Sequence, residues 1–489
     1  MSAINFNSIP ADIRVPFMTM EFDSSRATTG AQAQPYRAIL FGQKLPTGTA
    51  ETGKPILIHS LNQAKSLFGI SSMLAELVDY YRRVDVATEL WALAVPDNED
   101  GIQASAKISF SGSAASPGIL YTYIAGQRIT VSIAAGDQPA AVVAACITKV
   151  NNVPELPVTA AEDDGVLVLK AKQPGDVGNE IDLRFNYHTG ESFPTGISAT
   201  IQAFSGGAAN PDLTDAIAKV AGEWFNGFVS PYTDPHNLLI LTEEMARRNG
   251  PLVQQEGWVF GVRRGEFGDL CAFGNAHNTE HVCIMHGHGV PSSPWCFAAT
   301  IAANAMYYGN IDPARPFQTL PCPGILAPNL EDRFTDFPEN NQLLQSGISI
   351  FKSLSDSSVQ IGRLITTYKT NEAGADDTAY LDLNTGMTLS YIRYSWRQHL
   401  QKRFPRHKLG NDNVKYNGDE AIVTPMLAKA ETAVIAREWE KRGLMENVDT
   451  FIKNLVVVRD ASPNRLNFLM DPDLMNQFIV GAAKARFIL

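Results

Sequence analysis

The sequence contains no apolar run of the roughly 18 residues that a membrane-spanning helix requires. Its first residues, MSAINFNSIP, lack both the basic start and the apolar core of a secretory signal peptide. Cysteine is scarce: the chain has 5, scattered and odd in number, which does not suit a framework of disulfides. We therefore expect free thiols in a reducing cytoplasm, no secretion and no membrane insertion.

Motifs that identify many catalytic or cofactor sites are absent as well. There is no Walker A sequence, no strand-linked Gly-x-Gly-x-x-Gly and no Cys-x-x-Cys pair. The densest group of possible metal ligands is HNTEHVCIMHGHG. Residues 281–288 are predicted to form a strand, with His281 and Cys283 on one side and His286 and His288 on the other. This spacing favours histidines with a structural role, with no bound metal and no cofactor.

The HGHG segment also raises the alternative of a serine hydrolase, because a subtilisin-like enzyme carries its general base in a His-Gly sequence. The nucleophile is the difficulty. Neither a Gly-Thr-Ser-Met-Ala type of turn nor a Gly-x-Ser-x-Gly elbow occurs, and PSSPW offers no glycine that would permit a strained turn. We keep a subtilisin-fold hydrolase as an alternative and predict that the protein is not an enzyme.

Acidic residues are missing from one long interval, between Asp382 and Asp412. The whole chain has a net charge of −11, yet the segment from Tyr391 to Leu489 holds 16 basic and 11 acidic residues. A nucleic-acid surface, a solvated helix face and a surface for an acidic protein partner all remain open from charge alone. The basic residues of this segment include Arg393, Arg397, Lys402 and Arg403.

Strand and helix patterns alternate through much of the chain, as is typical of a parallel α/β sheet. YRAILFGQ, KPILIHS and ELWALAVP are predicted strands, and Ser60 and Gly69 would begin and end the first helix. After residue 210, LTDAIAKVAGEWF is a predicted helix, followed by the predicted strands HNLLILT, GWVFGVRRG and HVCIMHGHG and the alanine-rich helix PWCFAATIAANAMYYG. We assign residues 23–101 and 207–365 to one discontinuous α/β domain.

The intervening residues 102–206 have a different pattern. Short alternating strands such as QASAKISFSG and LPVTAAEDDGVLVLKAK are separated by Gly, Pro and Asp turns, with one helix capped by Asp137. We expect a β-rich domain inserted into the α/β domain.

Residues 366–489 are predicted to form a last, α+β domain. Its two helices run roughly from Thr388 to Phe404 and from Pro425 to Gly443, the second with Thr424 as its N-cap. TFIKNLVVVRD and NRLNFLM are its predicted strands.

Both ends of the chain alternate between apolar and polar residues. In residues 1–22, Ile4 and Phe6 alternate with asparagines, and two prolines exclude a helix. Free ends usually fray unless something holds them. A strand pattern that reaches the last residue therefore requires a partner. At the C-terminus the residues that would share one face of such a strand are Ala483, Ala485, Phe487 and Leu489.

The stretch HVCIMHGHGVPSSPWCFAATIAANAMYYGNIDPARPFQTLPCPGILAP resembles the tail sheath proteins of contractile-tailed phages, especially the Mu-like branch. The likeness lies in a strand that ends near Gly289, the Pro-Ser-x-Pro-Trp start of an alanine-rich helix, and DPARPFQTLPCPGILAP. IPADIRVPF, GILYTYIAGQRITVSIAAGD, KQPGDVGNEIDLR and NRLNFLM agree in the same order. The resemblance therefore spans essentially the whole chain.

This resemblance implies a structural role and a multidomain fold that combines α/β and α+β parts. The α/β domain would be subtilisin-like without proteolytic activity, the inserted domain would protrude, and the last domain would lie nearest an inner tube. Sheath subunits stack as hexameric rings, and their extended arms join neighbours by β-augmentation. The arm residues that the resemblance singles out are Ile4, Phe6, Ala483, Ala485, Phe487 and Leu489.

The resemblance also implies partners and a place of action. We expect a helical polymer of this chain, an inner tail tube protein that meets the basic residues Arg393, Arg397, Lys402 and Arg403, and baseplate and tail terminator proteins. Direct binding of nucleic acid is not expected. The protein would assemble in the host cytoplasm and reside in the virion tail, whose contraction drives the tube through the host envelope. An unrelated self-assembling shell protein is the second alternative.

Overall fold

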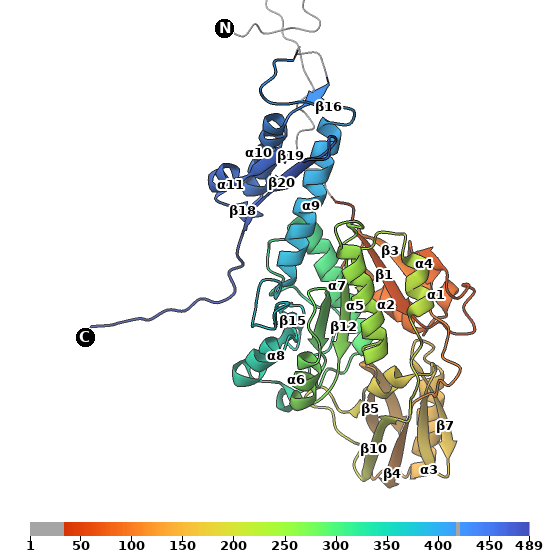
Figure 1. Cartoon of the computed structure of the whole chain (residues 1–489). Coiled ribbons are helices and arrows are strands. Elements are labelled where there is room, and N and C mark those ends of the chain that lie inside the picture. The colour runs from red at the N-terminus through yellow and green to blue at the C-terminus, as the bar shows by residue number, and fades with distance from the viewer. Residues whose placement is uncertain (1–33, 417–420, 489) are drawn as a thin grey trace, which may run out of the picture. The chain divides into compact units, whose positions relative to one another are not determined.

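The computed structural model describes residues 34–416 and 421–488 (Figure 1). It divides into two compact units. One runs from Pro35 to Tyr391 and takes in the segment that begins at Asn476, and the other runs from Ile392 to Met475. The fold is a mixed α/β fold with several sheets.

The first unit is built on a six-stranded sheet with the order β13-β12-β11-β1-β3-β2. Five strands run parallel, and β2 is antiparallel to β3 at the edge. The strands are β1 (Arg37–Gly42), β2 (Pro55–Leu57), β3 (Glu89–Ala94), β11 (Gly227–Val229), β12 (Trp258–Arg263) and β13 (Val282–His286). Since β1, β12 and β13 are buried on both faces, they are nearly continuous apolar runs, as strands of a covered parallel sheet must be.

Helices pack around this sheet (Figure 1). They are α1 (Leu61–Phe68), α2 (Met73–Arg82), α4 (Thr214–Val220), α5 (Pro235–Asn249), α6 (Phe267–Asn275) and α7 (Pro294–Ile311). Ser60 accepts a hydrogen bond from the Gln63 amide and Gly69 ends α1, as predicted. Nearly every side chain of α7 is buried, and its alanines let it lie close to α2 and to β12.

The predicted strand HNLLILT is wrong, because these residues belong to α5. Asp234 caps this helix by accepting a hydrogen bond from the Asn237 amide at 3.0 Å, and Pro235 occupies its first position. Leu238, Leu241 and Met245 are buried at helical spacing. A short apolar run of this kind fits either a strand or a helix, but the Asp-Pro sequence before it is a helix start signal and indicates a helix. The sheet position is instead taken by the three-residue β11, which the sequence analysis missed.

Residues between Ser105 and Ser205 form two antiparallel sheets and one helix. One sheet has the order β10-β4-β8-β7 and the other β6-β5-β9. The elements are β4 (Ser105–Gly112), β5 (Gly118–Ile124), β6 (Gln127–Ile133), α3 (Pro139–Asn151), β7 (Val158–Asp163), β8 (Val166–Ala171), β9 (Leu183–Phe185) and β10 (Ile197–Ser205). The helix begins one residue later than predicted: Gln138 is the N-cap, and the Asp137 carboxylate instead accepts a hydrogen bond from the Ala134 amide.

After α7 the first unit continues with short elements and ends inside a long helix. These are α8 (Asn341–Gln345), the antiparallel pair β14 (Ile350–Ser353) and β15 (Val359–Arg363), and α9 (Leu383–Arg403). The division between the two units falls within α9. This helix begins at Leu383, earlier than the predicted Thr388.

The second unit contains two further helices and three small two-stranded sheets. Thr424 caps α10 by accepting a hydrogen bond from the Leu427 amide, as predicted. TFIKNLVVVRD is only half a strand, because its first part is α11 and only VVVR is extended. The elements are β16 (Lys408–Leu409), β17 (Ile422–Val423), α10 (Pro425–Lys441), β18 (Met445–Glu446), α11 (Val448–Asn454), β19 (Val456–Arg459), β20 (Leu466–Leu469) and β21 (Asp473–Leu474).

Candidate assembly site

The histidine-rich segment lies on and beside β13. His286 and His288 both contact the ring of Phe334, at 5.3 and 4.3 Å between centroids, so they share a side as the alternation predicts. His288 Nδ1 lies 3.0 Å from the Gly265 carbonyl oxygen and His277 Nδ1 2.8 Å from that of Phe273. Among the described residues, no group of three or more His, Cys, Asp or Glu side chains is placed to hold a metal ion.

His286 is a poor candidate for a general base. Burial lowers its pKa to about 3, and His288 adds to the effect. In the described part of the chain neither ring nitrogen has a hydrogen-bond partner, so no Ser–His pair of the kind a hydrolase uses is formed. The ring stacks on Phe351 at 4.5 Å, and this contact is typical of an aromatic core residue.

The C-terminal segment from residue 476 forms neither helix nor strand in the described chain. Its first residues are held by two side-chain hydrogen bonds within the first unit, from Gln477 Nε2 to the Ala314 carbonyl and from Gln318 Nε2 to the Phe478 carbonyl. From Val480 to Ile488 every residue is exposed, and Phe487 is 83% exposed. A strand-patterned, apolar segment thus reaches solvent without joining any sheet among the described residues.

The predicted arm residues fall partly outside the described chain. Ile4, Phe6 and Leu489 lie outside the residues that the structure describes. Ala483, Ala485 and Phe487 lie in the exposed segment, so the structure brings none of them into contact with a sheet. Their pairing with another subunit stays a prediction.

A second exposed apolar surface lies on the hairpin of β19 and β20. Val457 and Phe468 are cross-strand partners, and Phe468 packs edge-on against Trp396 of α9 at 5.1 Å. The opposite face carries Val456, Val458 and Leu469, which are 45, 49 and 60% exposed. Val456 and Leu469 are paired across the strands, so they form one patch that we call the hairpin patch. The sequence predicted these strands but not that one apolar face would remain uncovered.

Two-stranded sheets of this size are marginal by themselves, because one neighbour satisfies only half of each strand's hydrogen-bonding capacity. Among the described residues β19 and β20 pair only with each other. The hairpin therefore offers backbone edges and an apolar face to an added strand. The sequence does not predict this uncovered hairpin, because the positions of the covering helices α9 and α10 are determined by tertiary packing.

The basic residues of α9 have different environments. Arg403 Nε lies 2.8 Å from Glu431 of α10, and His399 Nε2 lies 3.1 Å from the same carboxylate. Glu431, which is remote in sequence, thus neutralises part of the positive charge of α9. Arg393 and Arg397 are half-buried and already have interaction partners. Lys402 is exposed.

No helix in the described part of the chain has the length and apolar character needed to cross a membrane. The surfaces described above, an exposed strand-patterned tail, an uncovered hairpin and a basic helix end, form the candidate site for association with protein.

Comparisons with known proteins agree with an assembly role. A family model described as the phage tail sheath protein central domain matches residues 206–367, and one described as the phage tail sheath C-terminal domain matches residues 375–487. A curated relative, the Mu-like prophage FluMu tail sheath protein of Haemophilus influenzae, is 36% identical over 489 residues, which covers 100% of both chains.

One solved structure with a TM-score of 0.50 supports the fold. The sheath tail protein Lin1278 of Listeria innocua is 12% identical, with a TM-score of 0.50 over 91% of this chain and 93% of that one. The sheath tail protein DSY3957 of Desulfitobacterium hafniense is 14% identical, with a TM-score of 0.48 over 94% of this chain and 100% of that one.

Proposed function

This chain belongs to the phage tail sheath protein family, as a contractile-tail subunit and not an enzyme, and we propose that it polymerises as stacked hexameric rings around an inner tail tube. Contraction of this polymer drives the tube through the host envelope. The observation that carries the proposal is the collinear identity of 36% with a tail sheath protein over the full length of both chains.

The proposed domain organisation follows the sequence boundaries. Residues 23–101 and 207–365 form the α/β sheath domain, for which the mostly parallel six-stranded sheet is compatible with a subtilisin-like core. Residues 102–206 form the protruding β-rich domain, and residues 366–489 form the tube-proximal domain and its last arm. Residues 1–22 form the other arm.

Neighbouring subunits would be joined by strand addition. The exposed tail from Ala483 to Phe487 supplies the added strand, and the hairpin of β19 and β20 is the receiving sheet that its uncovered edges favour. Burial of Phe487 on pairing contributes about 1.5–3 kcal/mol. Each ladder hydrogen bond adds about 0.5–1.5 kcal/mol. Such a contact joins rigid bodies through flexible chain, so the subunits can rotate during contraction while they stay connected.

The tube partner would be acidic on its outer surface. Lys402 is the basic residue of α9 best placed for it, because it is exposed, whereas the exposed Arg403 already pairs with Glu431. Baseplate and tail terminator proteins would bound the polymer at its two ends. No contact with nucleic acid is needed for this role.

Electron microscopy of the purified full chain tests the proposal. We expect hollow helical tubes of constant width when the protein is concentrated. Closed shells would favour an unrelated self-assembling shell protein. Monodisperse particles that never polymerise, even with purified tube as a template, would contradict a sheath function.

A further inference from the structure

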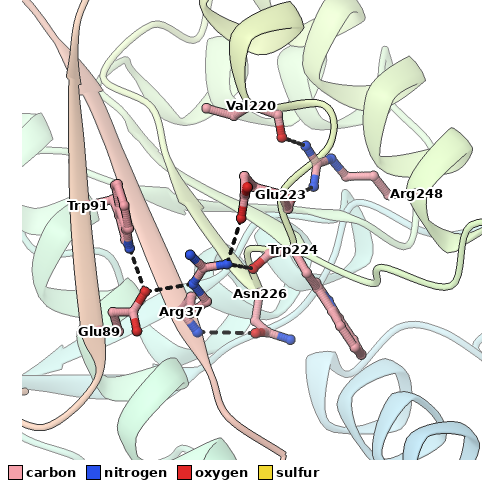
Figure 2. Close-up of polar contacts among 8 residues, drawn as sticks. All are labelled: Arg37, Glu89, Trp91, Val220, Glu223, Trp224, Asn226 and Arg248. Atoms are coloured by element: carbon pink, nitrogen blue, oxygen red, sulfur yellow. Dashed lines mark hydrogen bonds and ion pairs between the residues drawn. The ribbon is translucent and has the colours of Figure 1, made fainter. Parts of the chain in front are cut away.

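Arg37, the first residue of β1, connects β1 to β3 and to the segment that precedes β11. Its Nε donates to Glu89 Oε1 at 2.7 Å, at the first residue of β3 (Figure 2). Its Nη1 lies 3.1 Å from Glu223 Oε2, in the segment that leads into β11. The Arg37 backbone N–H donates to Asn226 Oδ1, and the Arg37 carbonyl accepts from the Asn226 amide. We call these four residues the Arg37 cluster.

Both sides of the cluster are fixed by further contacts. On the β3 side, Trp91 Nε1 donates to the same Glu89 oxygen at 2.7 Å. On the β11 side, Arg248 donates to the carbonyls of Val220 and Glu223, both at 2.6 Å (Figure 2). Arg248 is 0% exposed. The backbone that carries Glu223 is thus held by a buried arginine, and the Glu89 carboxylate is shared between Arg37 and Trp91.

The cluster also has a distinctive position along the chain. β1 is an inner strand of the sheet, paired with β3 from Arg37↔Glu89 to Gly42↔Ala94 and with β11 on its other side. The residues that precede it include the proposed N-terminal arm, residues 1–22. A pull on that arm reaches the folded sheet at Arg37 before any other strand residue.

We propose that the Arg37 cluster is the anchor through which tension on the N-terminal arm enters the central sheet. This inference rests on the proposed function, because it needs an arm that is held by a neighbouring subunit during contraction. Through Arg37 the tension is shared at once among β1, β3 and the segment before β11. Without the Arg37 side-chain contacts, only the backbone hydrogen bonds of β1 to β3, β11 and Asn226 would carry it.

The test is single-molecule force spectroscopy on the full chain, with handles at the two termini. Forced unfolding reports the rate of barrier crossing, so a contact on the path of the force changes the rupture rate directly. We expect R37Q to raise the rupture rate at fixed force about tenfold, the effect of losing roughly one charge-assisted hydrogen bond. Moving the first handle to the exposed Asp164–Gly165 turn should abolish most of this difference.

R363Q is the matched control. Arg363 donates to both oxygens of Asp382 at 3.0 and 2.9 Å, and its side chain is 23% exposed, against 25% for Arg37. We expect it to change the urea midpoint much as R37Q does, with little effect on rupture from the termini. Should R37Q fail to fold, R37K keeps the charge but loses the two-sided geometry, and the same comparison applies.

The outcomes separate the anchor from the proposed function. An R37Q rupture rate equal to that of the wild type, or equal effects of R37Q and R363Q, would overturn the anchor. These measurements use single chains, so they stand even if the arms do not join subunits. In assembled sheaths the anchor predicts that R37Q tubes form but fragment on contraction, whereas a failure to form any tubes from the wild-type chain would count against the sheath function alone.

Discussion

His286 is 3% exposed and lies between the rings of Phe351 and Phe334. Its ring is therefore held neutral, since a buried imidazolium would lack both water and a counter-charge. A histidine with a folded pKa of about 3 behaves as an aromatic core residue at neutral pH. In acid it lowers the stability of the fold, because the unfolded chain binds a proton that the folded chain does not.

We predict that H286F makes the protein less sensitive to acid. The folded pKa lies below the ordinary value of 6.5, so the stability present above pH 6.5 is lost as pH falls toward 3. The loss for wild type reaches up to about 1.4 kcal/mol per pH unit in that window. Urea midpoints measured between pH 7 and pH 4.5 should fall more steeply for wild type than for H286F. Parallel curves would contradict the assignment.

The sequence predicts the alternation of this strand and hence which histidines share a face. It does not predict their aromatic neighbours Phe334 and Phe351, because those contacts join segments remote in sequence. For the same reason, the spacing of the histidines in the sequence does not show which of their rings pack against aromatic residues.

At the scale of elements, two of the three predicted helix caps, Ser60 and Thr424 but not Asp137, were confirmed, and short apolar runs were the least predictable features. Ser60 and Thr424 begin their helices as expected, because a cap is a local hydrogen bond between residues close in sequence. The prediction for HNLLILT was wrong and that for TFIKNLVVVRD was right only for VVVR, because short apolar runs satisfy either periodicity. The uncovered hairpin patch depends on which helices pack on the other face, and that choice is not local.

The exposed tail gives a prediction at this scale. A chain that ends at Gly481 should fold with an unchanged urea midpoint, because the deleted residues up to Ile488 are exposed in the single chain. It should form no tubes, since each subunit contact loses roughly 5–10 kcal/mol of apolar burial and ladder hydrogen bonds before ordering costs. Sedimentation and electron microscopy measure both outcomes.

The double variant K484A/R486A is the matched control for this truncation. It removes the tail's charges but keeps Phe487 and the alternating apolar residues, so tubes should persist. Unfolding or aggregation of the truncated chain would place the tail in its own domain, and normal tubes from it would remove the tail as a connector.

For the whole molecule, the sequence shows the balance of charge, but only the structure shows which charges are paired. The net charge of −11 and the positive C-terminal part are visible in the sequence. The sequence does not show that Glu431 neutralises part of α9, because this carboxylate comes from a different helix. Local sequence pattern does not predict which cations remain exposed, because that depends on contacts between helices.

We predict that K402E weakens co-assembly of the sheath with its tube. Lys402 is exposed, so the reversal should leave the urea midpoint unchanged. An exposed ion pair contributes only about 0–1 kcal/mol, which suits a contact that must break on contraction, but the contribution repeats at every subunit. We therefore expect co-sedimentation with the tube to fail at a lower salt concentration than for wild type.

K453E is the control, because Lys453 is also exposed but belongs to α11. Equal effects of the two variants would mean that only net charge matters, and an unchanged salt profile for K402E would remove this end of α9 from the tube surface. Salt-sensitive binding of duplex DNA that K402E abolishes would instead assign the basic segment to nucleic acid. An acidic tube predicts the same salt dependence but for binding to the tube, because a negatively charged tube and a sheath that binds it through Lys402 must separate as the salt rises.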